Sequence, residues 1–141
     1  MRTLGIIALL LGLAACGGDA TLPAGAAGRY ALAAVNGQAL PFTLPGTAAG
    51  VTVTVEEGRL TLDEGGDFFL VILTHTATAD PGDTDPGELR AETAGTVTAS
   101  GSTLRFRPRF ESPFTGTLTG AGLVYTRPAG GVDLQYAFVR S

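Results

Sequence analysis

Hydrophobic and polar side chains alternate along most of the chain after residue 28. The alternation is clearest in residues 51–55, 60–62, 104–110 and 132–138, where every second side chain is apolar. Successive side chains of a strand point to opposite faces of a sheet, so a period of two predicts strands with one apolar face and one polar face. No stretch of useful length carries apolar residues at helical spacing without an interrupting glycine or threonine. The pattern therefore predicts an all-β fold.

Short glycine-containing segments separate the alternating runs and predict tight turns. They are Asn36-Gly37, Glu57-Gly58, Gly65-Gly66, Ser100-Gly101, Gly120-Ala121-Gly122 and Gly130-Gly131. Glycine and asparagine tolerate the positive φ that a tight hairpin needs. Between these turns the pattern predicts eight to ten strands, at about residues 29–35, 39–44, 50–56, 59–63, 67–77, 89–98, 102–109, 114–119, 122–127 and 132–139.

The short connections between these strands indicate an antiparallel up-and-down meander. A long meander leaves two open edges unless it closes on itself. We therefore predict closure into a β-barrel, with a two-sheet β-sandwich as the alternative.

The N-terminus has the pattern of a signal peptide. A single positive charge, Arg2, precedes the apolar residues 4–13, a run too short for the roughly 20 residues of a membrane-spanning helix. Leu13-Ala14-Ala15-Cys16 follows and resembles the lipobox of bacterial lipoproteins. The resemblance implies cleavage before Cys16 and attachment of a diacylglycerol to its sulfur.

This interpretation divides the chain into three parts. We expect a signal peptide at residues 1–15, lipidated Cys16 with a flexible Gly/Ala-rich linker at 16–28, and a folded domain at 29–141. The protein is then exported and anchored in the cell envelope by its lipid. Gly17 follows the cysteine in place of the aspartate that usually retains lipoproteins in the inner membrane, which favours the outer membrane in a bacterium with two membranes. The alternative is an ordinary secreted protein in which Cys16 is incidental.

The opening of the domain resembles that of small lipocalin-like (calycin-type) bacterial lipoproteins. The residues that carry the resemblance are Gly28-Arg29-Tyr30, Val35-Asn36-Gly37 and Leu40-Pro41. Tyr30 stands where a lipocalin has its first-strand tryptophan. The resemblance implies an up-and-down barrel and a non-catalytic role in binding.

Two kinds of partner besides the membrane fit this interpretation. The first is a small apolar ligand in the barrel or at its mouth. The alternative is another envelope protein, bound through an exposed apolar strand or sheet edge. Residues 68–73 are apolar on both faces of their strand, so this strand is either covered on both sides or carries an exposed patch. The interior is either filled or hollow: Ala, Gly and Thr favour a cavity, and the bulky side chains Leu104, Phe106, Phe110, Tyr136 and Phe138 favour filling.

Charge and catalytic residues limit the other function classes. The 141 residues carry nine basic and thirteen acidic side chains, and this modest negative charge does not suit nucleic-acid binding. His75 is the single histidine, and no serine lies in a Gly-x-Ser-x-Gly pattern. One histidine and one cysteine cannot fill a zinc site. We therefore expect neither an enzyme nor a cofactor.

Two charged segments admit both a structural and a functional interpretation. Residues 80–88 hold four carboxylates and two Asp-Pro-Gly turns, which predict a solvated hairpin loop, with a calcium site as the alternative. Arg105, Arg107 and Arg109 form a stripe on one strand. We expect them to face water and pair with acids such as Glu92 or Asp133; the alternative is contact with an anionic glycan or lipid head group.

Overall fold

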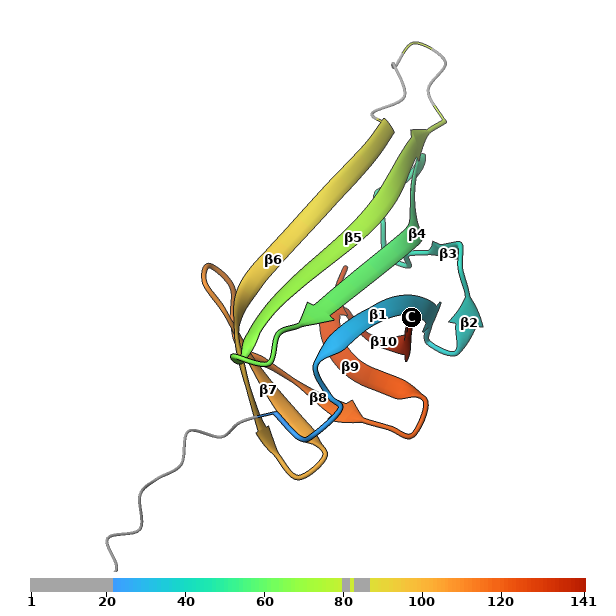
Figure 1. Cartoon of the computed structure of the whole chain (residues 1–141). Coiled ribbons are helices and arrows are strands. Elements are labelled where there is room, and N and C mark those ends of the chain that lie inside the picture. Colours follow the sequence, from blue (N-terminus) through green and yellow to red (C-terminus); the bar gives the residue numbers. More distant parts are fainter. Residues whose placement is uncertain (1–21, 80–81, 83–86) are drawn as a thin grey trace, which may run out of the picture.

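The computed structural model describes residues 22–79, 82 and 87–141, and every regular element among them is a β-strand (Figure 1). The predicted signal peptide and Cys16 lie outside the described residues. In chain order the strands are β1 (Gly28–Val35), β2 (Gln38–Ala39), β3 (Phe42–Thr43), β4 (Val51–Leu62), β5 (Asp67–Thr78), β6 (Gly87–Ser100), β7 (Thr103–Pro108), β8 (Phe114–Leu118), β9 (Gly122–Ala129) and β10 (Val132–Arg140). Within these ranges no helix could span a lipid bilayer.

Eight of the strands form a closed antiparallel barrel. Neighbouring strands follow the order β1, β10, β9, β8, β7, β6, β5, β4, and a pairing of β1 with β4 joins the two ends. This pairing aligns residues 28–31 with 59–62, for example Tyr30 with Leu60. The predicted up-and-down barrel is therefore confirmed, and the alternative of a two-sheet β-sandwich is wrong.

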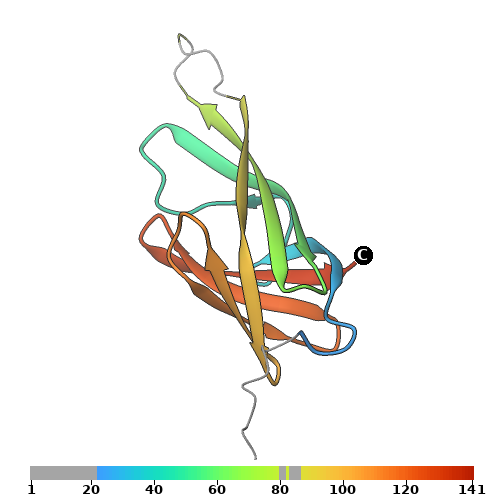
Figure 2. The ribbon, with the colours of Figure 1, turned by 60° about the vertical axis from the view of Figure 1, so that its left-hand side comes forward.

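The barrel has two different ends. Beyond Ala31, strands β1 and β4 separate; β2 pairs with β1 at Ala34 and Val35, and β3 pairs with β4 at Thr54 and Val55. At this end β4, β5 and β6 project beyond the other strands (Figures 1 and 2). The described N-terminal residues lie at the opposite end (Figure 1).

The predicted turn at Glu57-Gly58 is wrong, because β4 runs through both residues with a register shift between Val55 and Glu57. A methyl group on Gly58 would lie 2.8 Å from Cβ of Leu32 and 2.9 Å from Cδ1 of Ile72. Gly58 is therefore a site where neighbouring side chains approach the strand backbone, and not a hairpin turn.

The predicted strand at residues 39–44 is two short strands, β2 and β3, with Leu40 and Pro41 between them. Proline has no N–H to donate to a ladder, which explains the interruption.

The core is formed by the inward face of the alternating pattern. Leu60, Leu104, Phe106, Leu134 and Phe138 are each at most 2% exposed. The expectation for Phe110 is wrong: its side chain is 97% exposed, because β7 ends at Pro108 and the alternation ends with it.

Candidate functional site

Aromatic side chains fill the interior of the barrel. Phe106 and Phe114 stack with their ring centroids 4.7 Å apart, and Phe68 meets Phe106 edge-on at 5.0 Å. Tyr125 stacks on Phe138 at 5.5 Å. These rings occupy the space in which an eight-stranded barrel can hold one small ligand. The candidate sites are therefore at the mouth and on the outside.

Polar residues lie over this aromatic interior at the end where β5 and β6 project. Thr93 Oγ1 donates a 2.6 Å hydrogen bond to Glu111 Oε1, and Arg127 forms an ion pair with Glu111 Oε2. The Arg127 guanidinium lies 4.8 Å from the centroid of the Phe114 ring. We call these four residues the mouth cluster. They join β6, β8, β9 and the β7–β8 loop across one end of the barrel.

Three ionisable side chains in and beneath the mouth cluster have shifted pKa values. The hydrogen bond from Thr93, together with Arg127, holds the pKa of Glu111 below its ordinary value against the opposing effect of burial. Burial raises the pKa values of Tyr125 and Tyr136. At neutral pH, Glu111 is therefore a carboxylate that accepts hydrogen bonds, while both tyrosines are neutral.

A hollow with a volume of about 630 Å³ lies on the outer surface of β1, β4, β5 and β6. Strand register arranges its lining in rows across the sheet. One row contains Arg29, Thr61 and Phe69, and the next contains Ala31, Arg59 and Val71. We call this hollow the outer groove. Its lining combines apolar side chains of β5 with charged side chains of the neighbouring strands.

Strand β5 supplies an apolar row to this surface. Phe69, Val71 and Leu73 face outward, since the alternate residues Phe68, Leu70 and Ile72 point toward the core. Phe69 is 40% exposed, and Val71 is 8% exposed. The strand that is apolar on both faces thus has its inward face buried and its outward face partly open.

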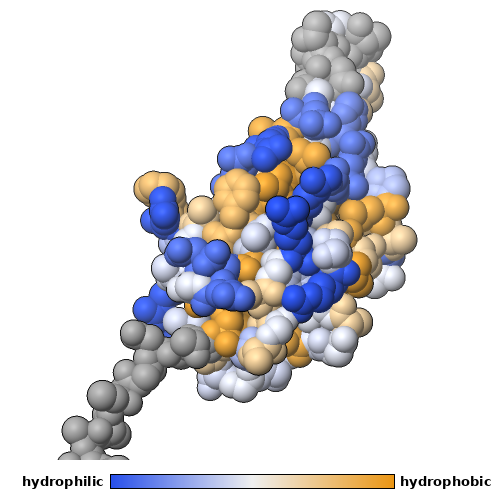
Figure 3. All heavy atoms as spheres, viewed as in Figure 1, coloured by the Kyte–Doolittle hydropathy of each residue, from blue (hydrophilic) through white to orange (hydrophobic). Residues whose placement is uncertain are grey.

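Two ion pairs border the apolar row. Arg59 Nε lies 2.6 Å from Glu57 Oε1 on β4, and Arg90 Nε lies 2.5 Å from Glu92 Oε1 on β6. Leu73 lies between these strands, opposite Glu57 on one side and Arg90 on the other. Figure 3 shows the resulting surface, in which hydrophobic and charged side chains alternate over β4, β5 and β6.

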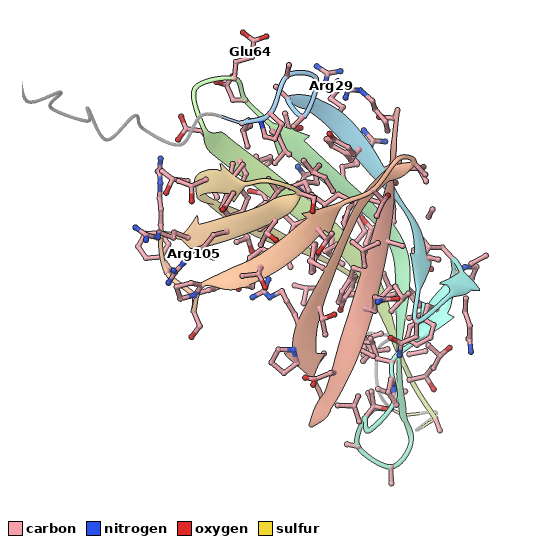
Figure 4. The ribbon with its side chains drawn as sticks, turned by 90° about the horizontal axis from the view of Figure 1, so that it is seen from below. Arg29, Glu64 and Arg105 are labelled. Atoms are coloured by element: carbon pink, nitrogen blue, oxygen red, sulfur yellow. The ribbon has the colours of Figure 1, made fainter. Side chains whose placement is uncertain are left out.

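Among the described residues, the arginine stripe forms no ion pair with Glu92 or Asp133, the acids that we expected as its partners. Arg105 and Arg107 of β7 face water opposite threonines of β6, while Glu92 binds Arg90. Arg109 lies after the end of β7. Figure 4 shows Arg105 at the outside of the barrel.

The other candidates lie apart from the mouth cluster and the outer groove. His75 is in β5, opposite Thr54 and Glu88 in the strand register. Most of the acidic loop at residues 80–88 lies outside the described residues, as does Cys16. The described ranges contain no group of three His, Cys, Asp or Glu side chains that could hold a metal ion.

A contact that the sequence does not reveal joins the last strand to the segment before β1. The described end of the predicted linker packs against the barrel, and Ala26 is 4% exposed. Arg140 of β10 donates hydrogen bonds to the carbonyl oxygens of Gly25 and Ala27. Figure 4 views the barrel from this end, with Arg29 and Glu64 at its rim. Because Arg140 is more than 110 residues from the linker, only the closed fold brings them together.

Comparison with known proteins does not assign a family. No protein-family model, curated protein or solved structure matches the chain. Its function is therefore argued from its own residues and geometry.

Proposed function

We propose that this chain is a non-catalytic, lipid-anchored protein of the cell envelope that binds another envelope protein through the outer groove. One observation carries the proposal: Phe69, Val71 and Leu73 lie on the outward face of β5, with Phe69 40% exposed, while aromatic rings fill the interior. A binding role then needs an external surface, and the outer groove offers a hollow of about 630 Å³ next to this apolar row.

The chemistry of the groove fits a protein partner. Protein interfaces combine an apolar centre with a polar rim, and they are enriched in aromatic residues and arginine. Phe69 and Val71 supply the apolar centre. Arg29, Arg59 and Arg90 supply three cations at the rim, against the carboxylates of Glu57 and Glu92 that pair with Arg59 and Arg90. A complementary partner segment carries apolar side chains next to acidic ones.

A photo-crosslinking amino acid in place of Phe69 tests the groove in intact cells. Val132 is the matched control position, because its 41% exposure equals that of Phe69 within one per cent and it lies at the β9–β10 turn. We expect a discrete protein adduct from position 69 and none from position 132. Arg59→Glu should reduce the yield of this adduct. The same adducts from both positions, or no adduct from position 69, would contradict the proposed interface.

The anchor is tested separately by intact-mass spectrometry of protein extracted from membranes. The expected species begins at Cys16 and carries the added mass of its acyl chains. Cys16→Ser should remove this mass and release the protein from the membrane. A chain that still begins at Met1 with an unmodified thiol would contradict the anchor without affecting the groove.

The second proposed function is binding of a small apolar ligand at the mouth of the barrel. The observation that favours it lies beyond the mouth cluster, where the inward face of the projecting sheet carries half-buried Ile72 and exposed Leu89. Native mass spectrometry of gently purified protein tests this function. A retained small molecule of defined mass supports it, and the mass of the polypeptide with its anchor alone contradicts it.

A further inference from the structure

Half of strand β6 forms a free sheet edge. On one side β6 pairs with β5 over residues 87–96, from Thr96 opposite Asp67 to Gly87 opposite Thr76. On the other side β7 pairs only with residues 95–100. Residues 88–93 therefore have no neighbouring strand on this side within the described part of the chain. Figure 1 shows β6 at the border of the projecting sheet.

The direction of the backbone groups along this edge follows from two hydrogen bonds. The carbonyl oxygen of Ala94 accepts from the N–H of Arg109, on the β7 side. The carbonyl oxygen of Leu89 accepts from Thr74 Oγ1, on the β5 side. Backbone groups alternate sides along a strand, so Glu88, Arg90 and Glu92 direct their N–H and C=O groups to the free edge. Such a row can pair with another strand.

We propose that this edge binds the same edge of a second copy of the chain, antiparallel, with a two-fold axis at Leu89. In this register Glu88 lies opposite Arg90 of the second copy, and Arg90 lies opposite Glu88 of the second copy. Each of these pairs exchanges two backbone hydrogen bonds, because all four residues direct their backbone groups to the interface. The interface is isologous, as expected for a symmetric dimer.

Charge complementarity selects this register together with burial of Leu89. The Leu89 side chain is 62% exposed in the single chain and meets Leu89 of the second copy across the axis. Opposite charges across a strand pair stabilise it, and like charges destabilise it. If the axis lay at Arg90, Arg90 would face Arg90 of the second copy, and Glu88 would face Glu92 of the second copy. If the axis lay at Ala91, Arg90 would face Glu92 of the second copy, but Leu89 would face the polar side chain of Thr93.

A charge exchange tests the dimer with residues 22–141, which contain the whole described core. Sedimentation equilibrium up to millimolar concentration should show dimers of the unchanged protein. Glu88→Arg places two arginines opposite each other, and Arg90→Glu places two glutamates opposite each other. Each variant by itself should therefore sediment as a monomer. An equimolar mixture of the two variants should regain it as a heterodimer. Arg105→Glu, an equivalent change on β7, should leave the dimer intact.

Disulfide cross-linking of the full chain in its membrane tests the register. Leu89→Cys should form a dimer band under mild oxidation, because residues at a non-hydrogen-bonded antiparallel position approach closely. The unchanged chain controls for Cys16. A monomer at every concentration, or a mixture of the two charge variants that stays monomeric, would overturn the dimer. A band from Ala91→Cys in place of Leu89→Cys would overturn the register.

Discussion

The Tyr30 hydroxyl donates a buried hydrogen bond of 2.6 Å to the carbonyl oxygen of Ala26. The Arg140 guanidinium lies 5.7 Å from the centroid of the same tyrosine ring and binds the backbone on both sides of Ala26. Together the two side chains hold the N-terminal segment at the barrel end opposite the projecting β5–β6 hairpin (Figure 1).

Tyr30→Phe tests the linker contact. The substitution leaves the Ala26 carbonyl oxygen buried without its donor, which should lower the free energy of unfolding by about 1–2 kcal/mol. Tyr136→Phe is the control, because the Tyr136 hydroxyl makes no hydrogen bond to the described residues; its effect should stay below about 0.5 kcal/mol. Urea denaturation measures both. Equal effects of the two substitutions would contradict the role of Tyr30.

Phe106→Ala and Phe110→Ala compare the same change inside and outside the barrel. Phe106 is fully buried between other rings, so its truncation should cost about 3–5 kcal/mol. Phe110 is 97% exposed, so its truncation should change stability by less than about 0.5 kcal/mol. Thermal unfolding followed by circular dichroism compares the two. A large loss for Phe110→Ala would mean that the β7–β8 loop packs against the barrel.

Gly122→Ala should destabilise the barrel because the strands approach closely there. An added methyl group would lie 2.0 Å from the carbonyl oxygen of Phe138, and the backbone would have to move. The expected loss is about 1–3 kcal/mol, typical of overpacking. Gly120→Ala in the same turn meets open space and should be close to neutral. Chemical denaturation of both variants provides the comparison, and equal midpoints would show that the strands adjust at no cost.

Glu111 should make stability depend on pH in the acidic range. Its pKa is lower in the folded protein than in the unfolded chain, so the ionised form favours folding. This contribution is fully present above the ordinary pKa of 4.5 and is lost as pH falls through the folded value. Solvent screens the pair, so the effect is at most about 1 kcal/mol.

Glu111→Gln isolates the contribution of this carboxylate. The difference in the free energy of unfolding between the unchanged protein and the variant should be largest near neutral pH and shrink below about pH 4.5. Denaturation curves from pH 7 to pH 3 measure this difference. A constant difference over the range would show that ionisation of Glu111 does not stabilise the mouth cluster.

The alternating pattern predicts strands well where it is regular and poorly where geometry interrupts it. In β7 and β10 the predicted inward positions Leu104, Phe106, Leu134 and Phe138 are buried, but Val132 at the start of β10 is 41% exposed. The pattern also assigned Phe110 to the inward face, and this assignment is wrong. The end of β7 is set by strand pairing, which the hydrophobic pattern does not show. Gly58 was assigned to a turn because a glycine that permits close packing and a glycine that permits a turn have the same sequence signal.

The candidate sites were less predictable than the strands. The sequence identified an unusual strand at residues 68–73, but it could not say which of its side chains face outward next to Arg59 and Arg90. It could not predict the mouth cluster either, because Thr93, Glu111 and Arg127 come from separate segments.

The order of side chains along the chain by itself determined an all-β fold, its meander and most of its buried positions, because strand periodicity and hydrophobic burial are local in sequence. Only the tertiary structure decided that β1 pairs with β4, that aromatic rings fill the barrel, and that β6 leaves an edge open. Each of these depends on contacts between distant segments. Curvature, register and side-chain volume set such contacts together, and no local pattern of residues records them.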